Sequence, residues 1–177
     1  LTCSTLTVAL NGAPGTGVAY QWTGPGFSGG TTSQNAVANA AGSFTLRVTD
    51  AVNGCTNIAV TSVSQNTTTP TLSASTSSSS ICAGSTTTLS ATGVGVNTYV
   101  WQPGSLAGAT RTVSPASTTI YTVTGTNTVT GCSASANITI TVNPLPTITA
   151  GPTKSLTCAS SFTTVTCSSV GGTSYNW

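Results

Sequence analysis

The sequence predicts an all-β chain built from copies of one small two-sheet sandwich, and three observations support this prediction. Short runs alternate apolar residues with Thr, as Ile138-Thr139-Ile140-Thr141-Val142 does. This alternation is typical of strands with one buried face. No segment of useful length has the period of a helix. A cysteine also precedes a tryptophan by the same 19 positions three times within 177 residues. A spacing that recurs unchanged indicates three copies of one structural unit.

The copies divide the chain into residues 1–69, 70–145 and 146–177. Pro70 begins the second copy and precedes Cys82 by the same interval by which Pro146, at the start of the third copy, precedes Cys158. The first copy lacks this lead-in and its strand, and the third stops at a tryptophan in mid-domain. We therefore expect a window on a longer repeat array. The alternative is a subunit whose incomplete domains are completed by strands from another chain.

The second copy gives the expected order of strands. Period-two runs between turn signals predict strands near 71–76, 85–92, 97–102, 109–114, 119–126 and 132–142. A Ser-rich crossing is expected at 77–80 and a turn at 127–131. About seven short strands per copy make two packed sheets. The links between copies are short and contain proline, which favours an extended path, so the predicted shape is a rod.

Aromatic residues are predicted to anchor the core of each copy. A tyrosine stands two positions before each repeated tryptophan, so both side chains face the same side of a strand. The residue between them faces the other way, and it is Gln21, Val100 and Asn176 in the three copies. The predicted core anchors are Tyr20, Trp22, Tyr99, Trp101, Tyr175 and Trp177.

Composition excludes several classes of function. Charged residues make up 2% of the chain, Asp50 is the single acid, and there is no His or Glu. Catalytic carboxylate pairs, His-based triads, histidine metal sites and calcium sites therefore cannot be assembled. A net charge of +2 without a basic cluster also argues against nucleic acid as a partner. We expect no enzymatic activity, no cofactor, no metal and no membrane insertion in this segment.

Six regularly spaced cysteines, without a C-x-x-C pair or a histidine, predict disulfides and hence an oxidising compartment. The expected pairs are Cys3 with Cys55 and Cys82 with Cys132. The second cysteine of each pair directly follows a turn that would place it at one end of its sandwich. Each bridge would close a loop inside one copy and stabilise that copy by about 4 kcal/mol.

The third copy holds two further cysteines, Cys158 and Cys167. In a single extended strand they would lie roughly 30 Å apart, far beyond the reach of a disulfide. Both are therefore expected to pair with residues outside this sequence.

The turn from Trp22 to Phe27 offers a second interpretation, a platform on which sugar rings could stack. Trp22 also occupies the repeated core position, and Gly24-Pro25-Gly26 has the composition of an ordinary turn. Burial of Trp22 would favour the structural role, whereas exposed coplanar aromatics would favour an external glycan as a partner.

Three longer stretches carry a family resemblance: Val48-Thr49-Asp50-Ala51-Val52-Asn53-Gly54-Cys55, Ser114-Pro115-Ala116-Ser117-Thr118-Thr119-Ile120-Tyr121-Thr122-Val123-Thr124, and Val142-Asn143-Pro144-Leu145-Pro146. They resemble the tandem Ig-like, or PKD-like, repeats of very large surface proteins in gliding Bacteroidota-type bacteria, including SprB-like motility adhesins exported by type IX secretion. The acidic residues of the PKD signature around the tryptophan are absent, so Ig-like is the better description. The resemblance implies tandem Ig-like sandwiches, an extracellular location, and a stalk or filament role with adhesion through other regions.

Together these observations predict a non-enzymatic structural stalk or filament segment of a bacterial cell-surface adhesin, stabilised by disulfides. Its expected partners are neighbouring repeats of the same chain and identical chains in a filament. Two alternatives stay open: an array of carbohydrate-binding modules, and a fibre subunit that assembles by strand donation.

Overall fold

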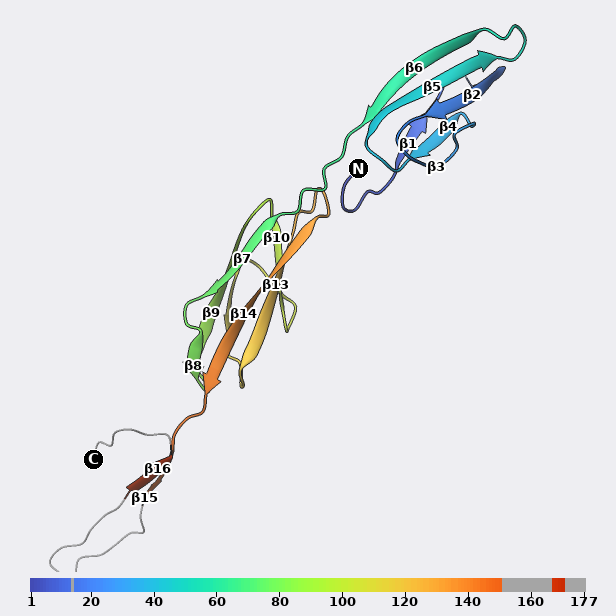
Figure 1. Ribbon diagram of the computed structural model, residues 1–177. Coiled ribbons are helices and arrows are strands. Elements are labelled where there is room, and N and C mark those ends of the chain that lie inside the picture. The colour runs from blue at the N-terminus through green and yellow to red at the C-terminus, as the bar shows by residue number, and fades with distance from the viewer. Residues whose placement is uncertain (14, 151–166, 171–177) are drawn as a thin grey trace, which may run out of the picture.

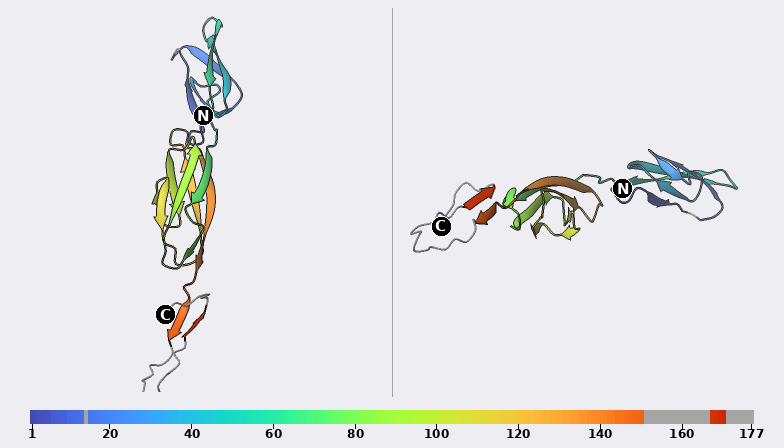
Figure 2. Two further views of the ribbon diagram at one scale, coloured as in Figure 1. Left: turned by 90° about the vertical axis from the view of Figure 1, so that its left-hand side faces the viewer. Right: turned by 90° about the horizontal axis from the view of Figure 1, so that it is seen from below.

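The computed structural model describes residues 1–13, 15–150 and 167–170. Every element in these ranges is a strand, and the strands form two sandwiches followed by a hairpin. The three parts follow one another end to end along one long axis (Figures 1 and 2). The predicted all-β, Ig-like fold is therefore confirmed. No helix among the described residues is long and apolar enough to cross a membrane.

Unit 2, formed by β7 to β14, is the fuller sandwich. Its strands are β7 (Thr71–Thr76), β8 (Ser80–Cys82), β9 (Thr87–Val94), β10 (Thr98–Gln102), β11 (Leu106–Ala107), β12 (Thr110–Val113), β13 (Thr119–Thr126) and β14 (Ser133–Asn143). One sheet has the order β12-β9-β7 and the other has the order β11-β10-β13-β14-β8. Strand β8 pairs with β14 in parallel, and the remaining pairs are antiparallel.

This strand order is that of an immunoglobulin sandwich. The first, second and fifth strands of that fold (β7, β9 and β12) share one sheet, and the third, sixth and seventh (β10, β13 and β14) share the other. Trp101 on β10 is fully buried, as is the tryptophan on the third strand of antibody domains. Antibody domains carry a cysteine two residues after the tyrosine of the sixth strand, and Val123 stands in that place after Tyr121. The core of unit 2 therefore packs without an internal disulfide.

Alternation along the strands builds that core. The inward residues of β9, β13 and β14 include Leu89, Val123 and Ile140, each 0% exposed, which pack with Trp101 in one cluster. On β7 the inward residues Leu72 and Ala74 are half-buried against the same cluster. Period-two patterning thus gives each strand one apolar face, and burial of those faces joins the sheets.

Unit 1, formed by β1 to β6, repeats this plan with fewer strands. Its strands are β1 (Val8–Asn11), β2 (Val18–Thr23), β3 (Phe27–Gly29), β4 (Asn35–Ala38), β5 (Gly42–Asp50) and β6 (Thr56–Val63). The sheets have the orders β1-β4-β3 and β2-β5-β6. Phe44 and Leu46 on β5 are buried with Trp22 and Leu10. The Phe44 ring meets Phe27 edge to face at 5.1 Å, which joins the two sheets.

The two units share one pairing register. Leu46 on β5 lies opposite Ala59 on β6, and Val123 on β13 lies opposite Ala136 on β14, so one constant shift in residue number relates both pairs. The isolated parallel bridge between Thr2 and Asn66 takes the place that β8 and β14 occupy in unit 2. A residue in one unit therefore has an identifiable counterpart in the other.

The hairpin of β15 (Thr147–Ala150) and β16 (Cys167–Val170) begins a third copy of the pattern. Thr147 pairs with Val170, and Ala150 with Cys167. In unit 2, Thr71 pairs with Val94 and Ala74 with Ala91, which is the same register one repeat period earlier. The repeat period seen in the sequence thus recurs as a repeat of strand pairing.

Candidate functional site

The junction between units 1 and 2 carries the most specific contacts outside the two cores. Residues 1–7 run back beside the chain that leaves β6. The Leu1 nitrogen donates to the Ser64 carbonyl at 2.6 Å, and the Asn66 amide donates to the Leu1 carbonyl at 2.8 Å. These bonds hold Cys3 at the end of unit 1 that faces unit 2, with its Sγ 4.0 Å from the Thr67 carbonyl oxygen.

A disulfide joins Cys3 of this segment to Cys132 of unit 2, across 129 positions of sequence. The Cα atoms are 5.0 Å apart, within the range of ordinary disulfides. Beside the bridge, Ser4 donates to the Thr130 carbonyl twice, from its amide at 3.1 Å and from its hydroxyl at 3.2 Å. Cys132 is 1% exposed and Thr130 is also buried, whereas Cys3 and Ser4 are exposed, so the joint is shielded from solvent on its unit 2 side only.

The turn that presents Cys132 is fixed by its own hydrogen bonds. The Asn127 side-chain oxygen accepts from the amides of Val129 and Thr130 at 3.0 and 3.1 Å. The Asn127 carbonyl accepts from the Gly131 amide at 2.7 Å. Gly131 has a φ of 72°, a region that favours glycine, and a Cβ there would lie 2.5 Å from the Cβ of Ser4. Glycine therefore allows both the turn and the close approach of unit 1.

An equivalent turn with no partner exists at the far end of unit 1. There the Asp50 carboxylate accepts from the amides of Val52 and Asn53 at 2.7 and 3.2 Å. Gly54 has a φ of 73°, and no atom lies within 4 Å of the place where its Cβ would be. Cys55, the counterpart of Cys132, is a free, exposed thiol. The same local sequence pattern thus builds the same turn with or without a neighbouring unit.

The two predicted pairings, Cys3 with Cys55 and Cys82 with Cys132, are wrong for this structure, and strand length explains why. In space, Cys3 lies at the end of unit 1 where β6 finishes, because Thr2 pairs with Asn66. Cys55 directly precedes the start of β6, so the eight residues of this strand separate the two cysteines by about 25 Å. Cys82 lies opposite Asn143 at the end of β14 and Cys132 precedes its start, so eleven residues separate them by about 35 Å. Neither distance permits a disulfide.

The remaining cysteines divide into described and undescribed positions. Cys82, like Cys55, is a free, exposed thiol. The expectation for Cys158 falls outside the described residues. Cys167 lies on β16, opposite Ala150 of β15, and its pairing with a residue outside this sequence stays a prediction.

The predicted core anchors lie within the sandwiches wherever they are described. Trp22 is 5% exposed and Trp101 is 0% exposed, and their indole nitrogens donate to the carbonyls of Ser33 and Gly108, both at 3.1 Å. Tyr20 and Tyr99 are half-buried on the same faces. Tyr175 and Trp177 fall outside the described residues. At 5% exposure Trp22 presents little of its indole to solvent, although it contributes to the lining of a hollow in unit 1, so its burial favours the structural role.

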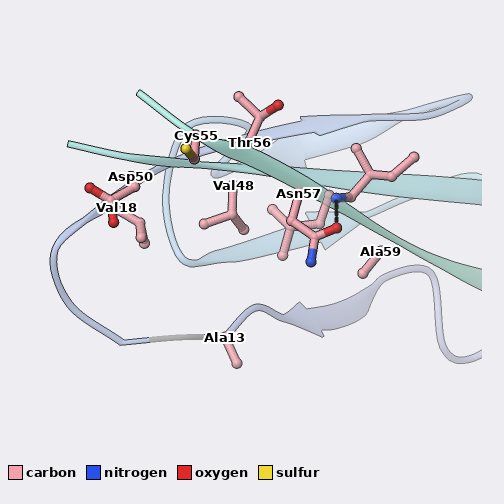
Figure 3. Close-up of a pocket in the computed structure, with 10 residues that line it drawn as sticks. Ala13, Val18, Val48, Asp50, Cys55, Thr56, Asn57 and Ala59 are labelled. Carbon is pink, nitrogen blue, oxygen red and sulfur yellow. Dashed lines mark hydrogen bonds between the residues drawn. The ribbon is translucent and has the colours of Figure 1, made fainter. Parts of the chain in front are cut away.

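Unit 1 also contains a cleft beside β1, which was not among the sites predicted from the sequence. Two adjoining hollows, of about 270 and 370 Å³, share Ala13, Leu46 and Ala59 in their linings. Figure 3 shows one end of this unit 1 cleft, with Val48 amid the lining residues. Asp50 is the one charged residue that lines it, and no group of three or more His, Cys, Asp or Glu that could hold a metal occurs among the described residues. The Asp50 carboxylate already accepts from the amides of Val52 and Asn53, and the rest of the lining is uncharged.

Comparison with known proteins found no sequence relative and some solved structures of low similarity. No family of known sequences matches the chain, and no curated protein matches it either. Among solved structures, the amphioxus IgVJ-C2 molecule is similar with a TM-score of 0.34 and 12% identity, over 77% of this chain and 96% of that one. The Sidekick-1 immunoglobulin domains 1–5 give 0.34 and 19%, over 83% of this chain and 39% of that one. The four N-terminal Ig domains of Dscam1 isoform 8.4 give 0.30 and 17%, over 77% and 41%. The Ig-like assignment itself stands on the strand order and register of the two units.

Proposed function

We propose that this chain is a non-enzymatic stalk or filament segment of a bacterial cell-surface adhesin, located outside the cell. One observation carries the proposal: the Cys3–Cys132 bridge joins two sandwiches instead of stapling one. Linker and bridge give the units two covalent connections, and two connections restrict bending more than one linker does. A segment of this design transmits force and keeps its neighbours apart, which a stalk requires.

The repeat register extends this proposal to the free thiols. Cys82 holds the place in unit 2 that Cys3 holds in unit 1, beside the chain that leaves for the third copy. Cys55 holds the place of Cys132, in the equivalent turn. In an array, Cys82 would bond to the following unit and Cys55 to the preceding one. Every joint would then have the same bridge, and the partners of this segment would be neighbouring repeats.

The location and the lineage rest on chemistry and on resemblance. A disulfide between the units fits an oxidising, extracellular compartment. The surface has few groups that titrate or respond to salt, because Ser and Thr supply the polarity. The resemblance to tandem repeats of gliding bacteria supports a place in a motility adhesin, whose binding regions would lie elsewhere. The absence of His and Glu from the sequence supports a non-enzymatic role.

A comparison of oxidised protein with the double variant Cys3→Ser/Cys132→Ser tests the stalk role. Negative-stain images and small-angle X-ray scattering would give the distribution of angles between units 1 and 2. We expect a narrow distribution with the bridge and a broad one without it, while Cys55→Ser/Cys82→Ser stays narrow. Equal distributions in all three proteins would contradict the proposal. Antibodies against unit 2 should label intact cells, and labelling only after lysis would contradict the surface location.

A further inference from the structure

The open side of unit 1 is the starting point for one more inference, which does not depend on the stalk role. Strand β1 is the end strand of its sheet, whereas its counterpart β9 lies between β12 and β7. The Gly12 amide donates to the Gln34 carbonyl on the β4 side at 2.9 Å. Backbone groups alternate in direction along an antiparallel strand, so those of Ala9 and Asn11 point away from β4. No strand pairs with that edge among the described residues.

The inner face of β6 is uncovered on the same side. In unit 2, β7 packs against β14, and the inward residues Ala136 and Ile138 are half-buried. Their counterparts in unit 1, Ala59 and Thr61, are both exposed. The unit 1 cleft runs between this face and β1, and Leu46 from the core forms part of its lining. An unpaired strand edge and an apolar cleft therefore occupy one location, the place that β7 fills in unit 2.

We propose that this cleft is a strand-acceptor site, which binds one extended, uncharged strand of the β7 type antiparallel to β1. Strand β7 shows what such an occupant looks like. It alternates exposed Ser or Thr with the inward residues Leu72 and Ala74, and it carries no charge. By the shared register, the residue equivalent to Ala74 would pair with Gly12, as Ala74 pairs with Ala91. Main-chain bonds to Ala9 and Asn11 would supply affinity, and the cleft would select the inward side chains.

One difference between the units predicts which side chain the site selects. In unit 2 the side chains of Val96 and Leu72 both lie over Gly125, where an added Cβ would be 2.9 Å from the Val96 Cγ1 and 3.1 Å from the Leu72 Cδ1. The register places Val48 of unit 1 at the position of Gly125. Val48 lines the cleft, so part of the space for a leucine is already filled. The acceptor site should therefore prefer a strand with a smaller residue, such as alanine, at the position of Leu72.

Peptides test this preference directly. One blocked peptide copies residues 70–77, and a second carries alanine in place of leucine at the position of Leu72. With the full chain, we expect the alanine peptide to bind at least tenfold more tightly and to slow hydrogen exchange at the Ala9 and Asn11 amides. Val48→Ala should reduce or reverse this difference. The proposal would be overturned if the two peptides bound the unaltered chain equally tightly and Val48→Ala equally tightly. Binding without protection of those amides would also overturn it.

Charge in the cleft provides the matched control. Ala59→Asp places a carboxylate on the inner face of β6, and we expect at least a tenfold loss of peptide affinity. Ser62→Asp places the same charge on the outer face of that strand, so affinity should be unchanged. Equal losses for the two variants would overturn the proposal.

A linked strand keeps the test decisive if free peptides bind weakly. The alanine peptide is fused ahead of Leu1 through two serines, so that with its own final serine it copies the three-serine connection between β7 and β8. The fusion should raise the denaturant midpoint of unit 1, leave that of unit 2 unchanged and protect Ala9 and Asn11. A midpoint that does not move would overturn the proposal.

Discussion

Replacing Cys3 with Ser should destabilise both units, although the residue belongs to one of them. When unit 1 unfolds beside a folded unit 2, the bridge and the linker hold both of its ends, at Cys3 and Pro70. When unit 2 unfolds, Pro70 and Cys132 are held in the same way, and the two closed loops are similar in length. In the chain-entropy model, closing a loop as long as either unit stabilises the folded unit by about 4 kcal/mol.

Hydrogen exchange with mass spectrometry in a denaturant series measures the two units separately. Peptides from β5 report on unit 1 and peptides from β13 report on unit 2. Cys3→Ser should lower the free energy of unfolding of each unit by about 2–4 kcal/mol, the usual range for loss of a disulfide. Cys55→Ser, which removes a free thiol, should change neither. A loss confined to unit 1 would refute the reasoning, because that result follows from a bridge between Cys3 and Cys55.

Three further predictions concern the junction, the core and the effect of pH. Gly131→Ala and Gly54→Ala should each lower the free energy of unfolding by about 1–2 kcal/mol, because alanine disfavours the left-handed φ. Only Gly131→Ala should displace Ser4 and speed hydrogen exchange of the Ser4 amide, and equal exchange in both variants would contradict this. Trp101→Ala should destabilise unit 2 by about 3–5 kcal/mol in urea denaturation, whereas Val100→Thr on the outer face should change it by less than about 0.5 kcal/mol; similar losses would contradict the assigned faces. Burial raises the pKa of Tyr121, so its contribution to stability is complete below about pH 10 and is lost as the pH rises through the raised value; Tyr121→Phe should remove this alkaline loss, and an unchanged loss in the variant would contradict the assignment.

Local patterning predicted most of the strands, because each strand buries one face and the alternation is written in the sequence. The strand expected near 132–142 is β14 at Ser133–Asn143, and the one expected near 119–126 is β13. Two short strands were not predicted. Strand β8 exists because it pairs in parallel with the distant β14, and β11 has only two residues. Pairing between remote segments leaves little trace in local composition.

The disulfides show why the site was harder to predict than the fold. Cysteine spacing indicates a repeated role, yet it does not tell which end of the sandwich each thiol occupies. One signal was present: a long strand follows Cys55 and another follows Cys132, and a strand carries the chain from one end of a sandwich to the other. The cleft of unit 1 lies where a counterpart to β7 is absent among the described residues, and comparison of the repeat copies in the sequence already shows that this strand is missing from the first copy.

Peptide mapping of the non-reduced protein tests the central claim most directly. Proteolysis at a pH that prevents thiol exchange, followed by mass spectrometry, identifies which cysteine-bearing peptides are joined. The structure predicts a linked pair that contains Cys3 and Cys132, with Cys55 and Cys82 of the isolated chain open to alkylation. Linkage of Cys3 to Cys55 and of Cys82 to Cys132 would contradict a bridge between the units.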